Sequence, residues 1–310
     1  MQQQIKSNMN MKIDKRNGEV CYNDEAHLYW NEHDNSKYIS VTTLIHQFTQ
    51  PFDKEFWSAY KALEKLIPKD SWGIEKKSLL STKRFDVSIL DLYDISNEEF
   101  NKVQEGILEE WDKANKESCE RGTKIHAELE NQYYNKSKDI SLKKFGLGGK
   151  FECKQGYTDL DLENGVYPEY LIYYQSEDGV LKVAGQIDLL IKNGNDIYIV
   201  DYKTNKKIDQ KSGFDTTTKK NATMLYPLNN LMDCNYMHYT MQLSTYAYML
   251  QQLNPDFVVK ELIMVHYDHE GNETIYNLDY LKDDVKRLFS FHKKNVIKEH
   301  QRAKRQRIEY

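Results

Sequence analysis

Three runs of strand-like sequence lie near the centre of the chain, separated by short turn signals. They cover residues 166–175, 180–191 and 197–204. Their length and their content of β-branched and aromatic residues predict β-strands. Asp178-Gly179 separates the first two runs, and Gly194-Asn195 separates the second from the third. Both dipeptides favour two-residue hairpin turns, so the sequence predicts a three-stranded antiparallel meander.

Helical patterns flank this meander on both sides. Apolar residues at helical spacing predict helices over residues 53–67, within 97–134, over 237–253 and from 279 onward. Short strands are predicted within residues 20–43, and a second hairpin over 257–268 and 273–278. Residues 69–100 have weak periodicity and yield no element. The pattern predicts an α/β fold class, more closely α+β, with a central mixed sheet flanked by helices.

No internal repeat and no linker rich in Pro, Gly or Ser divides the chain. We expect residues 1–100 to form an N-terminal extension of strands and helices that guides DNA. Residues 101–310 would form the core, with a basic C-terminal helix.

Composition excludes several classes of protein. The chain has 310 residues, of which 39% are hydrophobic and 12% aromatic, which suits a packed domain and not a disordered segment. No apolar run reaches the roughly 18 residues of a membrane helix, and residues 1–12 lack the apolar stretch of a secretory signal. We therefore expect a cytoplasmic protein that is neither secreted nor associated with a membrane.

The cysteines argue against a metal–sulfur site. Cys21, Cys119, Cys153 and Cys234 are far apart and form no Cys-x-x-Cys pair. Zinc ribbons and iron–sulfur clusters need close thiolates. We expect reduced thiols and no iron–sulfur cluster.

Charge is distributed unevenly. The net charge is -5, yet residues 291–310 carry seven Lys/Arg against two Glu, and residues 203–220 carry six Lys against two Asp. Local basic stretches on an acidic protein favour a polyanion held at one place. The alternative is a basic helix that is merely solvated.

The meander predicts a cluster of charged side chains. With both turns in place, Glu169 lies opposite Asp188, and Asp188 lies opposite Asp201. Lys203 is two residues beyond Asp201 and shares its face. Like charges opposite each other destabilise a sheet, whereas carboxylates are the ligands that Mg²⁺ prefers. The cluster therefore indicates a divalent-metal site, and the alternative is a set of ion-paired carboxylates on a solvated sheet face.

Four short motifs occur in a fixed order along residues 118–250. They are Gly122-x-x-x-His126, Gly185-x-x-Asp188, Asp201-x-Lys203-Thr204 and Gln242-x-x-x-Tyr246. In this order the chain resembles the PD-(D/E)XK nuclease superfamily, specifically its RecB-like branch without an iron–sulfur cluster. It is similar there to phage and mitochondrial genome maintenance exonucleases. The resemblance implies a restriction-endonuclease-like core.

The resemblance also implies a metal centre. His126, Asp188 and Asp201 would be ligands of Mg²⁺ or Mn²⁺, together with the carbonyl oxygen of Tyr202. Glu169 resembles an acidic residue that assists a second metal ion. His126 taken alone is more often a structural histidine.

Further roles follow from the same resemblance. Lys203 would position or activate the hydrolytic water. Gln242 and Tyr246 would hold the DNA backbone or end, and Gly122 and Thr204 would lie beside the substrate. Gln242 and Tyr246 taken alone are most simply a capping amide and a packed aromatic ring.

The predicted function is a Mg²⁺- or Mn²⁺-dependent deoxyribonuclease, an exonuclease on linear single- or double-stranded DNA ends in replication, recombination or repair. A helicase or annealing protein is the predicted partner, and the resemblance favours a phage protein in the host cytoplasm. Two alternatives stay open, namely the same chemistry on RNA or structured DNA, and a catalytically silent module that binds nucleic acid. Ile187 stands where the superfamily's name places proline.

Overall fold

The structure is a computed structural model that describes residues 13–154, 162–215 and 220–308. The chain forms two compact units. The first contains the described parts of residues 1–49, 124–214 and 221–310, and the second contains those of 50–123 and 215–220. The predicted division at residue 100 falls inside a helix that begins in the second unit and ends in the first.

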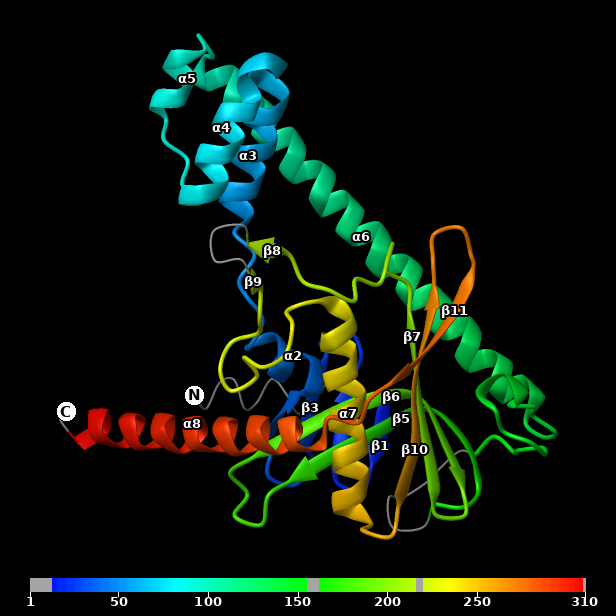
Figure 1. The fold of residues 1–310 in the computed structure, drawn as a ribbon. Coiled ribbons are helices and arrows are strands. Elements are labelled where there is room, and N and C mark those ends of the chain that lie inside the picture. The colour runs from blue at the N-terminus through cyan, green and yellow to red at the C-terminus, as the bar shows by residue number, and fades with distance from the viewer. Residues whose placement is uncertain (1–12, 155–161, 216–219, 309–310) are drawn as a thin grey trace. The chain divides into compact units, whose positions relative to one another are not determined.

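A mixed sheet is the frame of the first unit (Figure 1). Its described strands are β1 (Lys15–Asn17), β2 (Val20–Asn23), β3 (Leu28–Asn31), β4 (Lys37–Ser40), β5 (Gly165–Gln175), β6 (Lys182–Asn193), β7 (Asp196–Lys203), β10 (Val258–Tyr267) and β11 (Glu273–Leu278). They pair in the order β1-β2-β3-β4-β6-β7-β10-β11, and β5 pairs with β6. The β4–β6 and β7–β10 pairs are parallel and the other pairs are antiparallel. The predicted mixed sheet is therefore confirmed.

The paired parts of the central meander have the predicted registers, but the predicted pairs Glu169–Asp188 and Asp188–Asp201 are not formed. Glu169 interrupts the β5–β6 pairing, and the β6–β7 pairing ends at Leu189 and Val200. Pro168 pairs with Leu189 on β6, and Leu189 pairs with Val200 on β7. The β6–β7 connection is the predicted two-residue turn, because Asn193 pairs with Asp196. The β5–β6 connection is longer than predicted: pairing stops at Gln175 and Lys182, and the loop between them closes through the N–H of Ser176, 2.9 Å from the carbonyl oxygen of Leu181.

Helices cover both faces of this sheet. They are α2 (Val41–His46), α7 (Asn235–Leu253), α8 (Lys282–Ile308) and the last part of α6 (Asn97–Lys136). Met241, Tyr246 and Leu250 of α7 bury their side chains with Ile187 of β6 on one face. The segment 140–151 packs on the other face with Leu129 and Tyr133 of α6. Two apolar cores therefore enclose the central strands.

The predicted strand that ends at Thr43 is wrong in its last residues. Val41–His46 is helical, and the Ser40 side chain caps this helix by accepting the Thr43 N–H at 3.0 Å. A β-branched run favours a strand, but a serine N-cap supplies a partner for a free N–H and starts a helix. The sequence signal for α2 is therefore the cap and not the apolar run.

The second unit is helical. Its helices are α3 (Lys54–Leu66), α4 (Lys69–Thr82), α5 (Ser88–Leu92) and the first part of α6. Asp53 caps α3, since its carboxylate accepts the Phe56 N–H at 2.8 Å. Helix α4 lies where no element is predicted; it buries little apolar surface, chiefly at Leu79, so its periodicity is weak. Among the described helices, none has both the length and the apolar composition of a membrane span.

Candidate metal centre

The candidate centre lies where β6 separates from β7. The β6–β7 ladder ends at Leu189 and Val200, and the earlier part of β6 pairs with β4 instead. The backbone groups of β7 that follow Val200 therefore have no ladder partner in β6. Asp188 supplies one, because its Oδ2 accepts the Tyr202 N–H at 2.7 Å. His126 supplies the other, with Nε2 at 3.0 Å from the Tyr202 carbonyl oxygen.

Three potential metal ligands meet at this point. His126, Glu169 and Asp188 each offer one ligand atom, and these atoms lie within 4.8 Å of one another. The Nδ1 atom of His126 is 3.6 Å from Asp188 Oδ2 and 3.8 Å from Glu169 Oε1. The three residues come from α6, β5 and β6, so only the folded chain brings them together.

The backbone at Glu169 departs from a regular strand. Its φ is 50°, in the left-handed region that costs a non-glycine residue about 1–2 kcal/mol. The residues on either side, Pro168 and Tyr170, stay paired with β6. Tyr167 and Tyr170 then both enter the same core, so the usual alternation of faces is interrupted. This kink accompanies the approach of the Glu169 carboxylate to His126.

Asp201 and Lys203 form a buried ion pair next to this group. Asp201 is 1% exposed, and its Oδ2 lies 2.7 Å from Lys203 Nζ. Gln242 donates from Nε2 to the other oxygen, Oδ1, at 3.1 Å. Within the described residues, Oδ2 accepts no hydrogen bond of normal geometry. The Lys203 ammonium already balances the charge of this oxygen, and a carboxylate oxygen can also bind a divalent cation.

The charges of the centre shift the pKa values of its members. Burial lowers the pKa of His126, but the carboxylates of Asp188, Glu169 and Asp201 outweigh burial and raise it to about 9. Burial and the charge of Asp201 raise the pKa of Asp188. Burial lowers the pKa of Lys203, yet Asp201 and Asp188 raise it above its usual value. Without a cation the centre therefore holds protons on His126 and Lys203 and favours one on Asp188.

A family model of the PD-(D/E)XK nuclease superfamily matches residues 88–308. The chain belongs to the PD-(D/E)XK nuclease superfamily. Its members are typically hydrolases of nucleic acids that use divalent metal ions. A solved structure, "Crystal structure of SSO0001", aligns at a TM-score of 0.25 and 17% sequence identity, over 40% of this chain and 46% of that one. The alignment thus spans about half the length of that chain, and no curated protein matches the sequence.

The side chains present fit the divalent metal of a PD-(D/E)XK nuclease. Carboxylate oxygens and one imidazole suit Mg²⁺ or Mn²⁺. His126, Glu169 and Asp188 offer nitrogen and oxygen donors of the kind that such an ion needs. Asp201, which the sequence also predicts as a ligand, is outside this group, and its Oδ2 is paired with Lys203. Burial and the like charge of Asp201 raise the pKa of Asp188, and a bound cation would relieve the repulsion between the carboxylates.

The motif residues on α7 are next to Asp201, because Gln242 donates a hydrogen bond to its carboxylate. Gln242 and Tyr246 are both buried, and Gln242 Nε2 is 3.3 Å from Tyr246 Oη. A Cβ at Gly185 would come within 2.6 Å of the Tyr246 ring, so the glycine of the second motif makes room for the tyrosine of the fourth. The contacts that the structure shows for these residues are with Asp201 and β6.

Two other motif residues are close in sequence to members of the centre. Gly122 precedes His126 by one turn of α6, and Thr204 follows the last residue of β7. Thr204 is half-buried. Gly122 belongs to the second unit, so of these two residues Thr204 shares a unit with the centre.

Several residues of the centre escape sequence reasoning. Lys15 of β1 places Nζ 3.5 Å from Glu169 Oε2 and 3.6 Å from Glu130 Oε1. The Tyr239 ring lies 4.7 Å from Lys203 Nζ. No sequence signal identifies Lys15, because β1 is three residues long and far from the motifs. Tyr239 could have been found, since it lies one turn before Gln242 on the same predicted helix.

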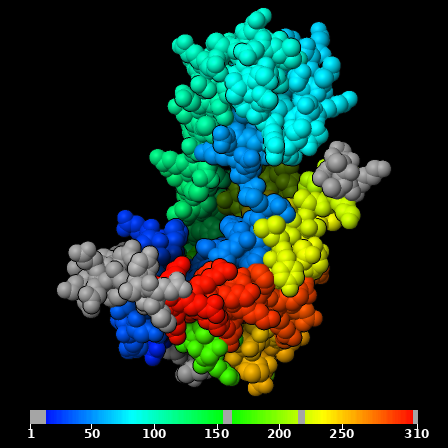
Figure 2. Space-filling model, turned by 90° about the vertical axis from the view of Figure 1, so that its left-hand side faces the viewer, coloured from blue at the N-terminus to red at the C-terminus, as the bar shows by residue number. Residues whose placement is uncertain are grey.

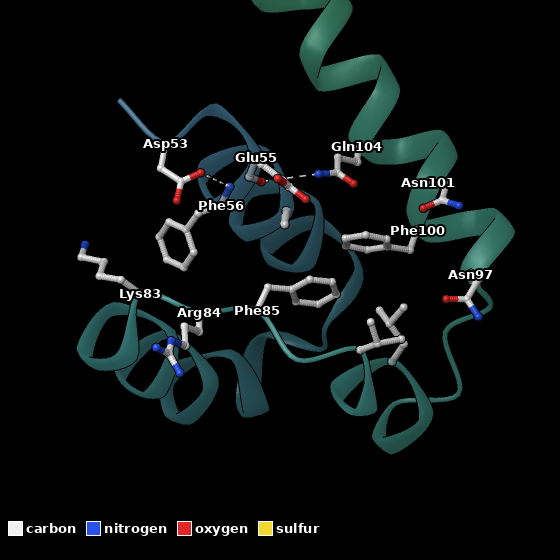
Figure 3. Close-up of a pocket in the computed structure, with 13 residues that line it drawn as sticks. Asp53, Glu55, Phe56, Lys83, Arg84, Phe85, Asn97, Phe100, Asn101 and Gln104 are labelled. Atoms are coloured by element: carbon white, nitrogen blue, oxygen red, sulfur yellow. Dashed lines mark hydrogen bonds between the residues drawn. The ribbon is translucent and has the colours of Figure 1, made fainter. Parts of the chain in front are cut away.

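The second unit contains a cavity of about 460 Å³ (Figure 3). Phe56, Phe85 and Phe100 form its apolar wall, and Asn101 and Gln104 of α6 add amide groups. Phe85 and Phe100 stack with ring centroids 5.0 Å apart. None of the motif residues lines this cavity, so it is a feature of the helical unit and not part of the candidate metal centre.

Proposed function

We propose that this chain is a Mg²⁺- or Mn²⁺-dependent deoxyribonuclease of the RecB-like branch that degrades linear DNA from its ends. One observation carries the proposal. A buried Asp201–Lys203 ion pair lies beside the ligand atoms of His126, Glu169 and Asp188. The pair has the Asp-x-Lys spacing on which the resemblance to the superfamily rests, and this superfamily is typically made up of nucleases.

The metal would be held by side chains from three elements. His126, Asp188 and Asp201 are the proposed ligands, with the Tyr202 carbonyl oxygen, and Glu169 would assist a second ion. A bound divalent cation stabilises the negative charge that develops on a scissile phosphate. Before the ion binds, His126 must release the proton from the nitrogen that becomes a ligand, because only neutral imidazole coordinates a metal.

Lys203 acts in this proposal as a permanent cation. Asp201 and Asp188 raise its pKa above the usual value, so in the metal-free protein the amine is protonated near neutral pH and can hold a water and balance charge on the phosphate. Asp201 and the Tyr239 ring fix the direction of the ammonium group. A preorganised charge of this kind is worth more in a buried site than in water.

Gln242 is proposed as a positioning residue. Its amide holds Oδ1 of Asp201, which leaves Oδ2 toward Lys203. Tyr246 in turn fixes the amide, since its hydroxyl lies 3.3 Å from Gln242 Nε2. The two residues thus orient a ligand of the metal, and this supports a catalytic centre over a silent one.

The choice of DNA ends, and of a role in replication, recombination or repair in a phage-infected cytoplasm, rests on the four motifs in their order. The decisive experiment is a time course on end-labelled linear single- and double-stranded DNA, with closed circular DNA and RNA as controls. It would be run in Mg²⁺, in Mn²⁺ and in EDTA, with the Asp201→Ala protein in parallel.

Loss of linear DNA alone, dependent on metal and on Asp201, is the expected result. Cleavage of circles would replace the exonuclease by an endonuclease. Cleavage of RNA alone would change the substrate. Binding of nucleic acid without any metal-dependent hydrolysis would overturn the proposal in favour of a silent binding module.

A further inference from the structure

Helix α8 carries a row of cations on one side. Lys294, Lys298, Arg302 and Arg305 are all exposed, and their spacing places them within about 80° of arc around the helix. We call these four residues the cationic face of α8. It is about 16 Å long at 1.5 Å per residue. Among the described residues no acidic side chain forms an ion pair with it, whereas Lys293 on another side is paired with Asp178.

A small cavity opens at the start of this face. Its volume is about 330 Å³, and its lining includes Tyr226, Arg287, Phe291 and Lys294. Tyr226 is 69% exposed, and its ring meets the Phe291 ring edge-on, with centroids 5.3 Å apart. Helix α8 lies at the surface of the molecule in this region (Figure 2). An exposed aromatic ring therefore lies next to the first lysine of the cationic face.

A short segment connects this cavity with helix α7, which carries Gln242. The Phe48 ring contacts Phe291 at 5.7 Å between centroids, and the Phe48 carbonyl accepts the Leu225 N–H at 2.7 Å. Two residues earlier, the His46 ring lies 6.4 Å from that of His238. His238 is one turn before Gln242 on α7, so residues 46–48 contact both the cavity and the helix that carries Gln242.

We propose that the cavity at Tyr226 and the cationic face of α8 bind an unpaired strand of nucleic acid. The strand's phosphates would lie along Lys294, Lys298, Arg302 and Arg305, and one base would stack on Tyr226. This proposal rests on the proposed function and deepens it, because it assigns a single-stranded segment to the substrate. Rings that stack on bases, together with cations that track the backbone, are the usual basis of single-strand binding.

A membrane surface fits these residues less well. An interfacial helix needs a broad apolar face that can leave water. Val296 and Ile297 of α8 are already partly buried, and the exposed residues around the cationic face are polar or charged. Stacking on Tyr226 also requires a flat ring partner, which a lipid headgroup lacks.

The test measures binding apart from cleavage. Fluorescein-labelled oligothymidylate of twenty nucleotides is titrated with protein in Ca²⁺, over a series of salt concentrations. We expect the triple variant Lys294→Ala/Lys298→Ala/Arg302→Ala to bind at least 10-fold more weakly. The slope of log K against log salt should fall by about 2, since each cation contributes about 0.7 on a single strand.

A matched control removes three exposed lysines elsewhere on the first unit. Lys138→Ala/Lys150→Ala/Lys260→Ala changes the net charge equally and should keep both the affinity and the slope. Tyr226→Ala should weaken oligothymidylate about 10-fold and leave an abasic oligonucleotide of the same length unaffected, and Tyr226→Phe should bind as the wild type. Equal binding by the two triple variants would overturn the proposal.

Two further measurements separate this proposal from the proposed function. Hydrolysis of bis-p-nitrophenyl phosphate in Mn²⁺ should be the same in the wild type and the α8 triple variant, because this substrate does not reach α8. If the wild type binds oligothymidylate through α8 but hydrolyses no substrate, the proposed nuclease function is rejected and the strand site is retained. If the α8 triple variant lost the binding to phosphatidylserine vesicles that the wild type shows, but still bound oligothymidylate as the wild type does, the strand site would be overturned in favour of a membrane surface.

Discussion

Lys203 has two chemically different neighbours in the candidate centre, the carboxylate of Asp201 and the face of the Tyr239 ring. Both favour a positive charge, one as an anion and the other through its π-electrons. The amine is also largely removed from water, at 17% side-chain exposure. A cation held in this way loses little freedom when a phosphate arrives.

Replacing Lys203 should therefore abolish hydrolysis and spare binding. We expect Lys203→Ala to lower kcat by at least about 10²–10³-fold, the range for losing one preorganised electrostatic group. Affinity for DNA in Ca²⁺ should change less than about threefold, because Lys203 lies inside the centre and most phosphates are contacted elsewhere. A Lys203→Ala protein that cleaves at the wild-type rate would contradict the mechanism.

The pH dependence of the metal-free protein follows from His126 and Asp188. The raised pKa values mean that the folded state binds these protons more tightly than the unfolded state. The stability from His126 is present below about pH 6.5, its unfolded pKa, and is lost as pH rises through about 9. The stability from protonated Asp188 likewise falls as pH rises above the unfolded range near 4.

The melting temperature in EDTA should therefore decrease between pH 5 and pH 9. Asp188→Asn should flatten this decrease, because it removes the buried carboxylate and its attraction for the His126 proton. Asp139→Asn, at an exposed carboxylate paired with Lys150, is the control and should keep the wild-type slope. Thermal melting monitored by circular dichroism would check this, and a melting temperature that rises over the same range would contradict the assignment.

At the scale of the element, the fit between β6 and α7 is set by one glycine. Gly185 faces the Tyr246 ring so closely that a Cβ would approach one ring atom to 2.6 Å. Tyr246 is 3% exposed and belongs to the main core, so the ring has little room to move. The same ring supports Gln242, and through it Asp201.

Gly185→Ala should thus destabilise the fold by about 1–3 kcal/mol, the usual cost of overpacking a core. It should also lower kcat, because Gln242 would move with Tyr246. Gly106→Ala is the control, since nothing lies within 4 Å of that Cβ in α6 and alanine favours a helix. Urea unfolding of both variants would check this, and equal stability for the two would contradict the packing argument.

The meander could be predicted because its registers depend on local turn chemistry. Gly194-Asn195 forms the predicted turn, and the pairings that follow place Asp188 next to the end of β7. The kink at Glu169 could not be predicted, because it is a left-handed residue within a strand-like run. Lys15 could not be predicted either, since its contact with Glu169 depends on how β1 folds onto a distant strand.

The burial of Gln242 and Tyr246 could not be predicted from the sequence either. Their spacing places them on one face of a helix, but spacing does not tell whether that face meets substrate or core. The structure shows that it meets Asp201 and Gly185. The motif was therefore identified from the sequence, while the direction in which it faces required the fold.

At the scale of the whole molecule, the proposed metal ligands all belong to the first unit. A ligand that binds the folded state adds about 2.7 kcal/mol at a hundred times its Kd. This gain in stability should appear in the elements that carry the proposed metal ligands. The helical second unit holds none of them.

Mn²⁺ should therefore slow hydrogen exchange in β5, β6 and β7 and leave α3 and α4 unchanged. The protection should disappear in Asp188→Ala, whereas Asp139→Ala, at an exposed carboxylate of the same unit, should keep it. Exchange followed by mass spectrometry, with and without the ion, would check both units in one experiment. Protection spread equally over both units would contradict a centre confined to the first.

The pairing of β4 with β6 bears on how this chain can be divided. The family similarity begins at residue 88, but a fragment cut there would lack β1–β4 and leave the first half of β6 without its parallel neighbour. An unpaired edge of this kind templates aggregation. The chain leaves the first unit after residue 49 and returns to it at residue 124, so the N-terminal strands belong to the first unit although the helical segment separates them from β5–β7 along the chain. A fragment meant to keep the sheet of the first unit fully paired must therefore retain β1–β4 together with the region of family similarity.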